Sequence, residues 1–455
     1  VASAQTASMV NWWEQISNPA STTVPQIKPG IIDQFVSLPP ALATGEIATA
    51  LDQAGGKVRV VGHSLGGHLT TIFASLFSGQ VSHSSTFNGA GLFSVGTSLI
   101  PANWFVNFLR GVPLTQLADL IGSTVQLPES KQDNFYAYNG LSVTTNSLTF
   151  TQIGERIGLF NEQSAFPVDN HYMYKLTDSL ALMAAMQKLD TSVTLDGLNK
   201  MFEAASATAD GSNEKMLDGL RKILLGNSIA ATPIFDSSAI SNKTNTDTPR
   251  TIYHRNLQEF ITSSQFESAQ GHVAITSLSE VTTTQIINAA TANNIVNDVP
   301  MAYRYALKEL NPFVVCGADY NQFNQNGELD LIDPATGNGN LSDSWIAKRA
   351  EMLTWLINGN IGDKRDLSGE MTITDNSIAG DWIFTDVDGK HKINVEHSTS
   401  SEIEDEFRNQ VHFSSATKSD NFTGGSVSDF IYGGGGNDRI CADNYAAITA
   451  RRCAA

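Results

Sequence analysis

Residues 62–67 read Gly62-His63-Ser64-Leu65-Gly66-Gly67, a G-x-S-x-G stretch. The run KVRVV at 57–61 before it is typical of a strand, and HLTTIFASLF at 68–77 after it is typical of a helix. We therefore expect Ser64 on a tight strand-to-helix turn, where the small residues at 62 and 66 permit a strained backbone and close packing. Such a turn presents the serine oxygen as a nucleophile beside the positive end of a helix dipole. The alternative is a chance loop of glycine and serine.

The composition is that of a globular protein. The chain has 455 residues, of which 41% are hydrophobic and 16% charged, and 46 acidic against 28 basic residues give a net charge of −18. This length suggests two or three domains. The negative charge argues against nucleic acid as a partner and is compatible with bound cations or with secretion. Three cysteines, Cys316, Cys441 and Cys453, allow at most one disulfide and lack metal-ligand spacing.

The chain begins at Val1, and residues 2–13 read as a helix without the basic start of a signal peptide. The serine follows after only 64 residues, whereas a sheet that carries such a turn normally has several strands before it. We expect an N-terminal truncation. The alternative is a minimal sheet.

The pattern along the chain changes from alternating strands and helices to helices and then to strands. This predicts an α/β domain at 1–190, a mostly helical region at 191–365 and a β-rich region at 366–455. Strands are expected at 83–87, 134–138 and 153–160, helices at 42–53, 176–189, 191–225, 280–310 and 342–357, and a loop at 228–251.

A serine hydroxyl needs a neighbouring imidazole as base and a third group that orients the imidazole. His171, in the turn-rich loop Pro167-Val168-Asp169-Asn170-His171, follows the third expected strand and is the candidate base. The alternative is an ordinary surface histidine.

The acid is expected after the strand at 134–138, yet residues 139–143 contain no carboxylate. Asp133 is the preferred candidate, with Asp119, Glu155 and Asp169 as the other nearby acids. The Asn139 amide or the Ser142 hydroxyl is an alternative orienting group.

A long apolar segment, residues 93–127, follows the second expected strand and contains almost no charge. An apolar flap beside a nucleophile suits an acyl chain, because burying each methylene yields about 0.8 kcal/mol. The alternative is that this segment forms ordinary core helices.

These motifs resemble those of bacterial extracellular lipases and phospholipases A1 related to class 3 lipases. The similar segments are VVGHSLGGHLTTIFASLF, STFNGAGLF, FTQIGERIGLF, NHYMYKLTDSLAL, YRYALKELNPFVVCGADY and NGELDLID. The resemblance implies an α/β-hydrolase core, catalytic Ser64 and His171, an oxyanion hole that uses the Leu65 N–H, and hydrolysis of lipid esters. The sequence departs from that pattern at two points. It has no acid near 139–142, and it lacks the upstream strand that carries a second oxyanion donor.

The C-terminal region carries nine-residue glycine and aspartate repeats. Residues 433–440 fit G-G-x-G-x-D-x-U, and residues 424–431 form a degenerate copy nine residues earlier. We expect a short parallel β-roll that binds Ca²⁺, with Phe430, Ile431 and Ile440 inside it. The expected ligands are Asp429, Asp438, Gly433, Gly434, Gly436 and Asn437. The alternative is a flexible glycine linker.

Together these features predict a secreted lipolytic serine hydrolase that acts on phospholipid at an aggregate surface. The calcium repeats and the missing N-terminal signal indicate export by a type I secretion system. The alternatives are a triacylglycerol lipase and, in another class, a calcium-dependent cell-surface or adhesin-like protein with a decayed hydrolase domain.

Overall fold

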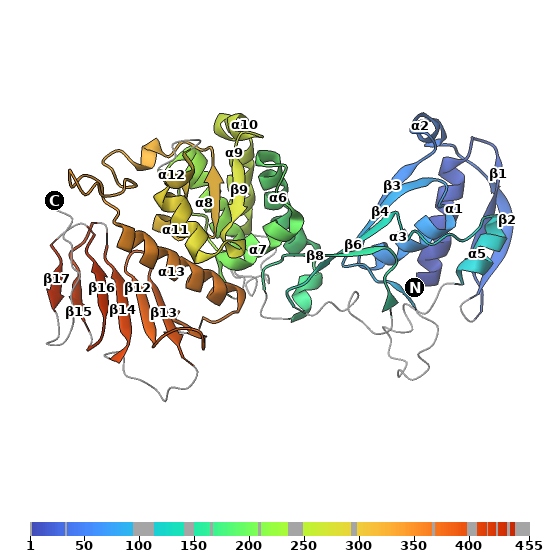
Figure 1. Ribbon diagram of the computed structural model, residues 1–455. Coiled ribbons are helices and arrows are strands. Elements are labelled where there is room, and N and C mark those ends of the chain that lie inside the picture. The colour runs from blue at the N-terminus through green and yellow to red at the C-terminus, as the bar shows by residue number, and fades with distance from the viewer. Residues whose placement is uncertain are drawn as a thin grey trace. The chain divides into compact units, whose positions relative to one another are not determined.

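The computed structural model describes residues 2–31, 34–93, 113–140, 150–163, 167–207, 211–234, 249–292, 298–365, 369–397, 407–415, 417–424, 426–434 and 437–441. The chain divides into two compact units, Val1–Thr177 and Asp178–Ala455 (Figure 1). Among the residues described, no helix is long and apolar enough to cross a membrane.

The first unit is built on a four-stranded parallel sheet with the order β3, β4, β6, β8. These strands are β3 (Val58–His63), β4 (Val81–Phe87), β6 (Gln132–Ala137) and β8 (Glu155–Leu159). Parallel neighbours need a crossover connection, and α3 (Leu65–Leu76) supplies it between β3 and β4. The α/β class predicted for this part of the chain is confirmed.

Two helices of the first unit pack together beside the sheet. The Trp13 ring of α1 meets the Phe73 ring of α3 edge-on, with centroids 4.9 Å apart. The helix expected at 42–53 is shorter than predicted, because residues up to Leu42 pair with β1 as an antiparallel strand. The other elements are α1 (Ala2–Ser17), β1 (Thr23–Pro29), β2 (Phe35–Leu42), α2 (Ala48–Gln53), β5 (Leu92–Phe93), α5 (Leu114–Ile121), β7 (Phe150–Thr151) and η1 (Pro167–His171).

The apolar segment expected as a flap is described only in part, because residues 94–112 lie outside the described ranges. Within the described part, α5 buries Leu117 completely in the core shared with α1 and α3. This part of the segment therefore behaves as ordinary core.

The second unit begins with helices. α6 (Met173–Leu189) crosses from the first unit into the second. Its other helices are α7 (Leu195–Ala205), α8 (Ser212–Leu225), α9 (Pro249–Ile261), α10 (Ser264–Ala269), η4 (Leu278–Glu280), α11 (Thr283–Thr291), α12 (Val299–Glu309), η6 (Asn321–Phe323) and α13 (Asp343–Ile361). One antiparallel strand pair, β9 (Ala274–Ser277) with β10 (Phe313–Cys316), lies among them.

The C-terminal strands form a mixed five-stranded sheet with the order β11, β13, β12, β14, β16, and a two-stranded sheet of β15 and β17. They are β11 (Met371–Thr374), β12 (Trp382–Asp386), β13 (His391–Glu396), β14 (Asn409–Phe413), β15 (Asn421–Thr423), β16 (Asp429–Tyr432) and β17 (Arg439–Cys441). α13 lies across this region (Figure 1). A buried ion pair of 2.6 Å between Arg349 of α13 and Asp386 of β12 fixes the helix to the sheet.

From β14 onward the chain alternates between two sheets. β14 pairs in parallel with β16, and β15 pairs in parallel with β17. Phe422 is thereby opposite Ile440, two nine-residue repeats later. Ile431 is buried, whereas Phe430 is half-buried and stacks on Trp382. The expectation that Phe430 fills a roll interior is not met, because successive side chains of a strand point to opposite faces.

Candidate active site

Ser64 lies between the end of β3 and the first residue of α3 and has a strained backbone, with φ 56° and ψ −120°. Backbone hydrogen bonds tie it to β4 and to the loop that follows: its N–H donates to the Phe87 carbonyl at 3.1 Å, and its carbonyl accepts from the Ala90 N–H at 3.1 Å. A non-glycine residue with positive φ costs free energy and persists when surrounding contacts impose it. The strand-to-helix turn predicted for Ser64 is present.

Glycine is required at two positions of this turn. A Cβ on residue 62 would overlap the Gly66 carbonyl, and one on Gly67 would lie 2.6 Å from the Gly89 Cα. A Cβ on Gly66 would meet nothing within 4 Å. The close approach expected of residues 62 and 66 is therefore made by Gly62 and Gly67.

His171 lies at the end of η1, and its Nε2 is 2.7 Å from the Ser64 Oγ. Burial, together with the charge of His63, holds the pKa of His171 below its usual value of 6.5. The imidazole is therefore neutral at pH 7 and able to accept a proton from the serine. The sequence-predicted pair of nucleophile and base is brought together.

The backbone of the His171 turn is fixed by side chains from β3 and from the end of β4. His63 Nε2 donates to the His171 carbonyl at 2.7 Å. Asn88, which is fully buried, donates from Nδ2 to the carbonyls of Asn170 at 2.9 Å and His171 at 3.2 Å. Its Oδ1 accepts from the Ala137 N–H at 2.9 Å, at the end of β6. Asn88 therefore ties two strand ends to the turn that carries the base.

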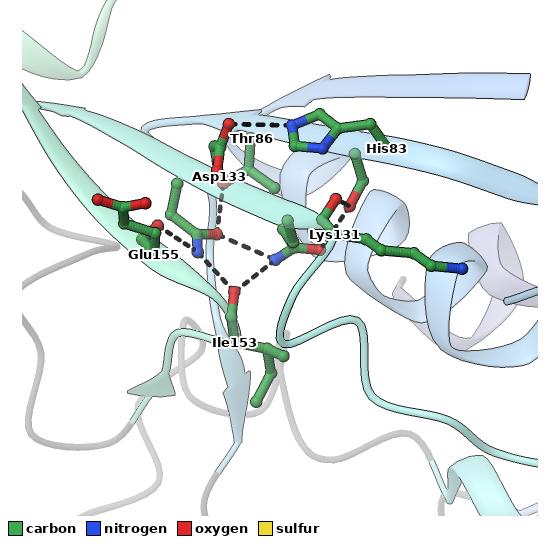
Figure 2. A network of polar contacts seen from close by, with 9 residues as sticks. His83, Thr86, Lys131, Asp133, Ile153 and Glu155 are labelled. Carbon is green, nitrogen blue, oxygen red and sulfur yellow. Dashed lines mark hydrogen bonds and ion pairs between the residues drawn. The ribbon is translucent and has the colours of Figure 1, made fainter.

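Asp133 is not placed to orient this imidazole. Its Oδ2 is 2.9 Å from His83 Nε2, a contact between β6 and β4 that Figure 2 shows. Asp133 is the second residue of β6, and at about 3.3 Å per residue it lies roughly 13 Å before the strand end at Ala137. Ser64 follows the carboxyl end of its own parallel strand. Across the sheet Asp133 pairs with Ser85 and Ser85 with Val61, so the preferred acid is level with Val61, three residues before Ser64.

The other expected orienting groups do not reach His171 either. Its Nδ1 is buried and has no hydrogen-bond partner among the described residues. The Asn139 side chain instead donates to the Asn161 carbonyl at 2.7 Å, and Ser142 lies outside the described ranges. The described site is a serine–histidine dyad without a third member.

Leu65 is the first residue of α3, directly after the nucleophile. The first N–H groups of a helix have no intrahelical acceptor and lie at the positive end of its dipole. The expected oxyanion donor is therefore in a suitable position for charge that develops next to Ser64.

The glycine and aspartate repeats have the same local conformation in both copies. A Cβ on Gly424 would overlap the Asp429 carboxylate, and one on Gly433 would lie 2.8 Å from Asp438 Oδ2. Asp438 Oδ1 also accepts from the Asp420 N–H at 3.0 Å. The remaining expected ligands, Gly434 and Asn437, are exposed, and Gly436 lies outside the described ranges.

Asp420 is a repeat position that the sequence reasoning missed. It lies nine residues before Asp429, and the Asp420-Asn421-Phe422-Thr423 run matches D-x-U-x. Its strand, β15, pairs with β17 of the last copy. The nine-residue spacing alone was the signal that would have found it. Among the described residues no group of three or more His, Cys, Asp or Glu side chains is arranged to hold a metal, but these repeats also offer carbonyl oxygens.

Comparison with known proteins yields no match: no family model, curated protein or solved structure is similar to this chain.

Proposed function

We propose that this protein is a secreted lipolytic serine hydrolase that cleaves carboxylic ester bonds of phospholipids. The observation that carries the proposal is the 2.7 Å approach of His171 Nε2 to the Oγ of a strained Ser64. Ser64 Oγ attacks the ester carbonyl as its proton passes to His171, and the Leu65 N–H stabilises the oxyanion. His171 then returns the proton to the leaving alcohol, and water hydrolyses the acyl-enzyme.

A fluorophosphonate probe tests the nucleophile. We expect labelling of the full chain, loss of labelling in Ser64→Ala and strong slowing in His171→Ala. Ser82→Ala is the matched control, because this exposed serine of β4 donates only to the Val58 carbonyl. Labelling that survives in Ser64→Ala would refute the assignment.

The substrate class rests on the resemblance and on the apolar sequence after β4. Fatty-acid release from phosphatidylcholine is expected to exceed release from a triglyceride at matched interfacial area. The reverse order would identify a triacylglycerol lipase instead.

The Nδ1 of His171, which has no hydrogen-bond partner among the described residues, favours one candidate from another class, a calcium-dependent surface protein whose hydrolase domain has decayed. A folded protein that neither labels nor releases fatty acid, yet still binds calcium, would establish that alternative.

We also propose that the repeats bind Ca²⁺ and that the protein is exported by a type I secretion system. The residues fit a hard cation, because Asp429 and Asp438 recur nine residues apart, each close to a glycine of its own turn, and carboxylate oxygens are the ligands that Ca²⁺ prefers. Ca²⁺ is expected to raise the unfolding temperature of the chain and EDTA to reverse this. The double variant Asp429→Asn/Asp438→Asn is expected to lose the shift, whereas Glu259→Gln, on the exposed side of α9, retains it. An equal shift in both variants would refute the site.

A further inference from the structure

Four side chains form one row across the parallel sheet, and the row begins beside the nucleophile. The pairing register places them at one level of the sheet, and they are, in strand order, His63, Phe87, Phe135 and Ile157. We call this set the cross-strand row. Its first member, His63, is the last residue of β3 and directly precedes Ser64.

The cross-strand row lies on the face of the sheet opposite α3. On β6, the buried Gln132 donates from its side-chain amide to the Thr71 hydroxyl of α3 at 2.9 Å. Successive residues of a strand point to opposite faces, so Phe135, three positions later, points away from α3. Every member of the row is partly exposed, and Val61, two positions before His63 on the same face, is 65% exposed. A parallel sheet is normally covered on both faces, whereas these side chains are accessible to a ligand.

The row is continuous with the catalytic dyad. The His63 ring lies 5.1 Å from the His171 ring, measured between centroids. The Phe87 ring stacks on the Phe135 ring at 5.1 Å, with 16° between their planes. Ile157 is the neighbour of Phe135 on β8. Adjacent strands are about 4.8 Å apart, so the three steps from His63 to Ile157 span about 14 Å.

The row is only one residue level wide on β6 and β8. Towards the start of these strands, the next level on the same face holds Asp133 and Glu155. Towards their ends, the next level holds Ala137 and Leu159, which are 0% exposed and therefore already covered. Levels that share a face are about 6.6 Å apart along a strand. A strip of this width fits a single hydrocarbon chain, whereas contact with a lipid surface requires an apolar patch of at least a few hundred Å².

We propose that the cross-strand row holds the acyl chain of the ester and limits its length to about ten to twelve carbons. This inference rests on the proposed ester hydrolysis at Ser64. An extended chain advances about 1.3 Å per bond, because three bonds separate Cα atoms 3.8 Å apart, so about eleven bonds match the row of about 14 Å. Phe87 and Phe135 contact the middle of the chain, and Ile157 contacts its end.

Hydrolysis of monomeric p-nitrophenyl esters of increasing acyl length tests the row on the full chain. Full burial of a methylene increases affinity about fourfold, so contact along one side of the chain is expected to give about twofold per methylene. We expect kcat/KM to rise about tenfold or more from the butyrate to the decanoate, through KM, and to stop rising beyond about twelve carbons.

Ile157→Ser tests the far end of the row by itself. This variant is expected to raise KM for the decanoate about fivefold and to leave KM for the butyrate unchanged, because a four-carbon chain does not reach β8. Ile157→Leu is expected to restore the wild-type profile. Val36→Ser, which alters a 40%-exposed apolar residue of β2, is the control that retains this profile.

Two results would overturn the row while leaving the proposed function in place: a flat chain-length profile in wild type, or equal losses for butyrate and decanoate in Ile157→Ser. In both cases, butyrate hydrolysis that disappears in Ser64→Ala shows that the hydrolase assignment stands. The wild-type profile requires no variant, so the row remains testable if Ile157→Ser does not fold. A folded chain that cleaves no ester and takes up no fluorophosphonate would overturn the proposed function and the row with it.

Discussion

Asn88 offers a quantitative test of how the base is held in place. Asn88→Ala removes the hydrogen bonds to the Asn170 and His171 carbonyls and the one from the Ala137 N–H. At about 1 kcal/mol each, these contribute roughly 3 kcal/mol to the free energy of unfolding. Asn88 also has φ 45°, a conformation that costs alanine roughly 1–2 kcal/mol more. We therefore expect a total loss of about 4–5 kcal/mol.

The catalytic effect of Asn88→Ala has a separate origin. With the turn released, the imidazole of His171 is no longer held at 2.7 Å from Ser64 Oγ. A displacement of about 1 Å at a reacting group lowers the rate by roughly 100-fold. Since the Asn88 side chain is fully buried, we expect it to make no contact with substrate and expect the loss in kcat for a p-nitrophenyl ester, with KM little changed.

Asn161→Ala is the matched control for this experiment. Asn161 is also fully buried, and it joins the ends of β6 and β8 through reciprocal bonds to Asn139 at 2.9 and 3.0 Å. Its hydrogen bonds among the described residues go to Asn139 and Glu162 and not to the His171 turn. Urea unfolding is expected to show comparable destabilisation in both variants, and the ester assay a large loss only in Asn88→Ala. Equal activity losses in both, or none in Asn88→Ala, would refute a positioning role.

Three further measurements follow from the geometry. The charge of His63 lowers the pKa of His171, so His63→Gln is expected to raise that pKa. In a pH profile of fluorophosphonate labelling, the acidic limb should then move to higher pH, and an unmoved limb would contradict this. Gly67→Ala is expected to destabilise the first unit strongly and Gly66→Ala only weakly, as urea unfolding would measure; equal effects would show that the turn relaxes freely. Burial lowers the pKa of His412 to about 4. As the pH falls below 6.5, this histidine therefore becomes protonated in the unfolded chain before it does in the folded one. The free energy of unfolding is expected to fall by at most about 3 kcal/mol by pH 4. His412→Gln is expected to reduce that pH dependence of stability, and an unchanged dependence would argue against a buried neutral imidazole.

The sequence predicted the dyad because its signals are local. The turn at Ser64 needs glycines at fixed positions, and the loop before α6 follows directly from the order of strands. The Asn88 contacts were not predictable in the same way, since they join residues about fifty and eighty positions apart. The Phe-Asn-Gly run at the end of β4 was visible, but its partners become apparent only when three strand ends are placed side by side.

The assignment of the acid failed for a reason that strand geometry explains. A search by distance along the chain found Asp133, yet this carboxylate lies level with Val61, three residues before Ser64, and contacts His83 instead of His171. Asp133 also alternates with Asn134, whose Oδ1 accepts from Gln132, and the same Gln132 amide donates to Thr71 of α3. The position along the strand was therefore a stronger criterion than the type of residue.

The missing third group has a specific chemical consequence for the dyad. To receive a hydrogen bond from the Ser64 hydroxyl, the His171 imidazole must carry its proton on Nδ1. A carboxylate beside Nδ1 stabilises that tautomer and later the imidazolium, and replacing such an acid by an amide lowers turnover by roughly 10⁴-fold in a serine protease. In this site Nδ1 has no acceptor among the described residues. The tautomer with its proton on Nε2, which donates to Ser64 Oγ, therefore competes with the productive tautomer that has its proton on Nδ1. Burial further disfavours the imidazolium. Asn88 and His63 thus hold the His171 turn in position, whereas no acceptor among the described residues stabilises an imidazolium through Nδ1. The dyad is therefore expected to react with a fluorophosphonate far more slowly than a complete triad, while still depending on Ser64.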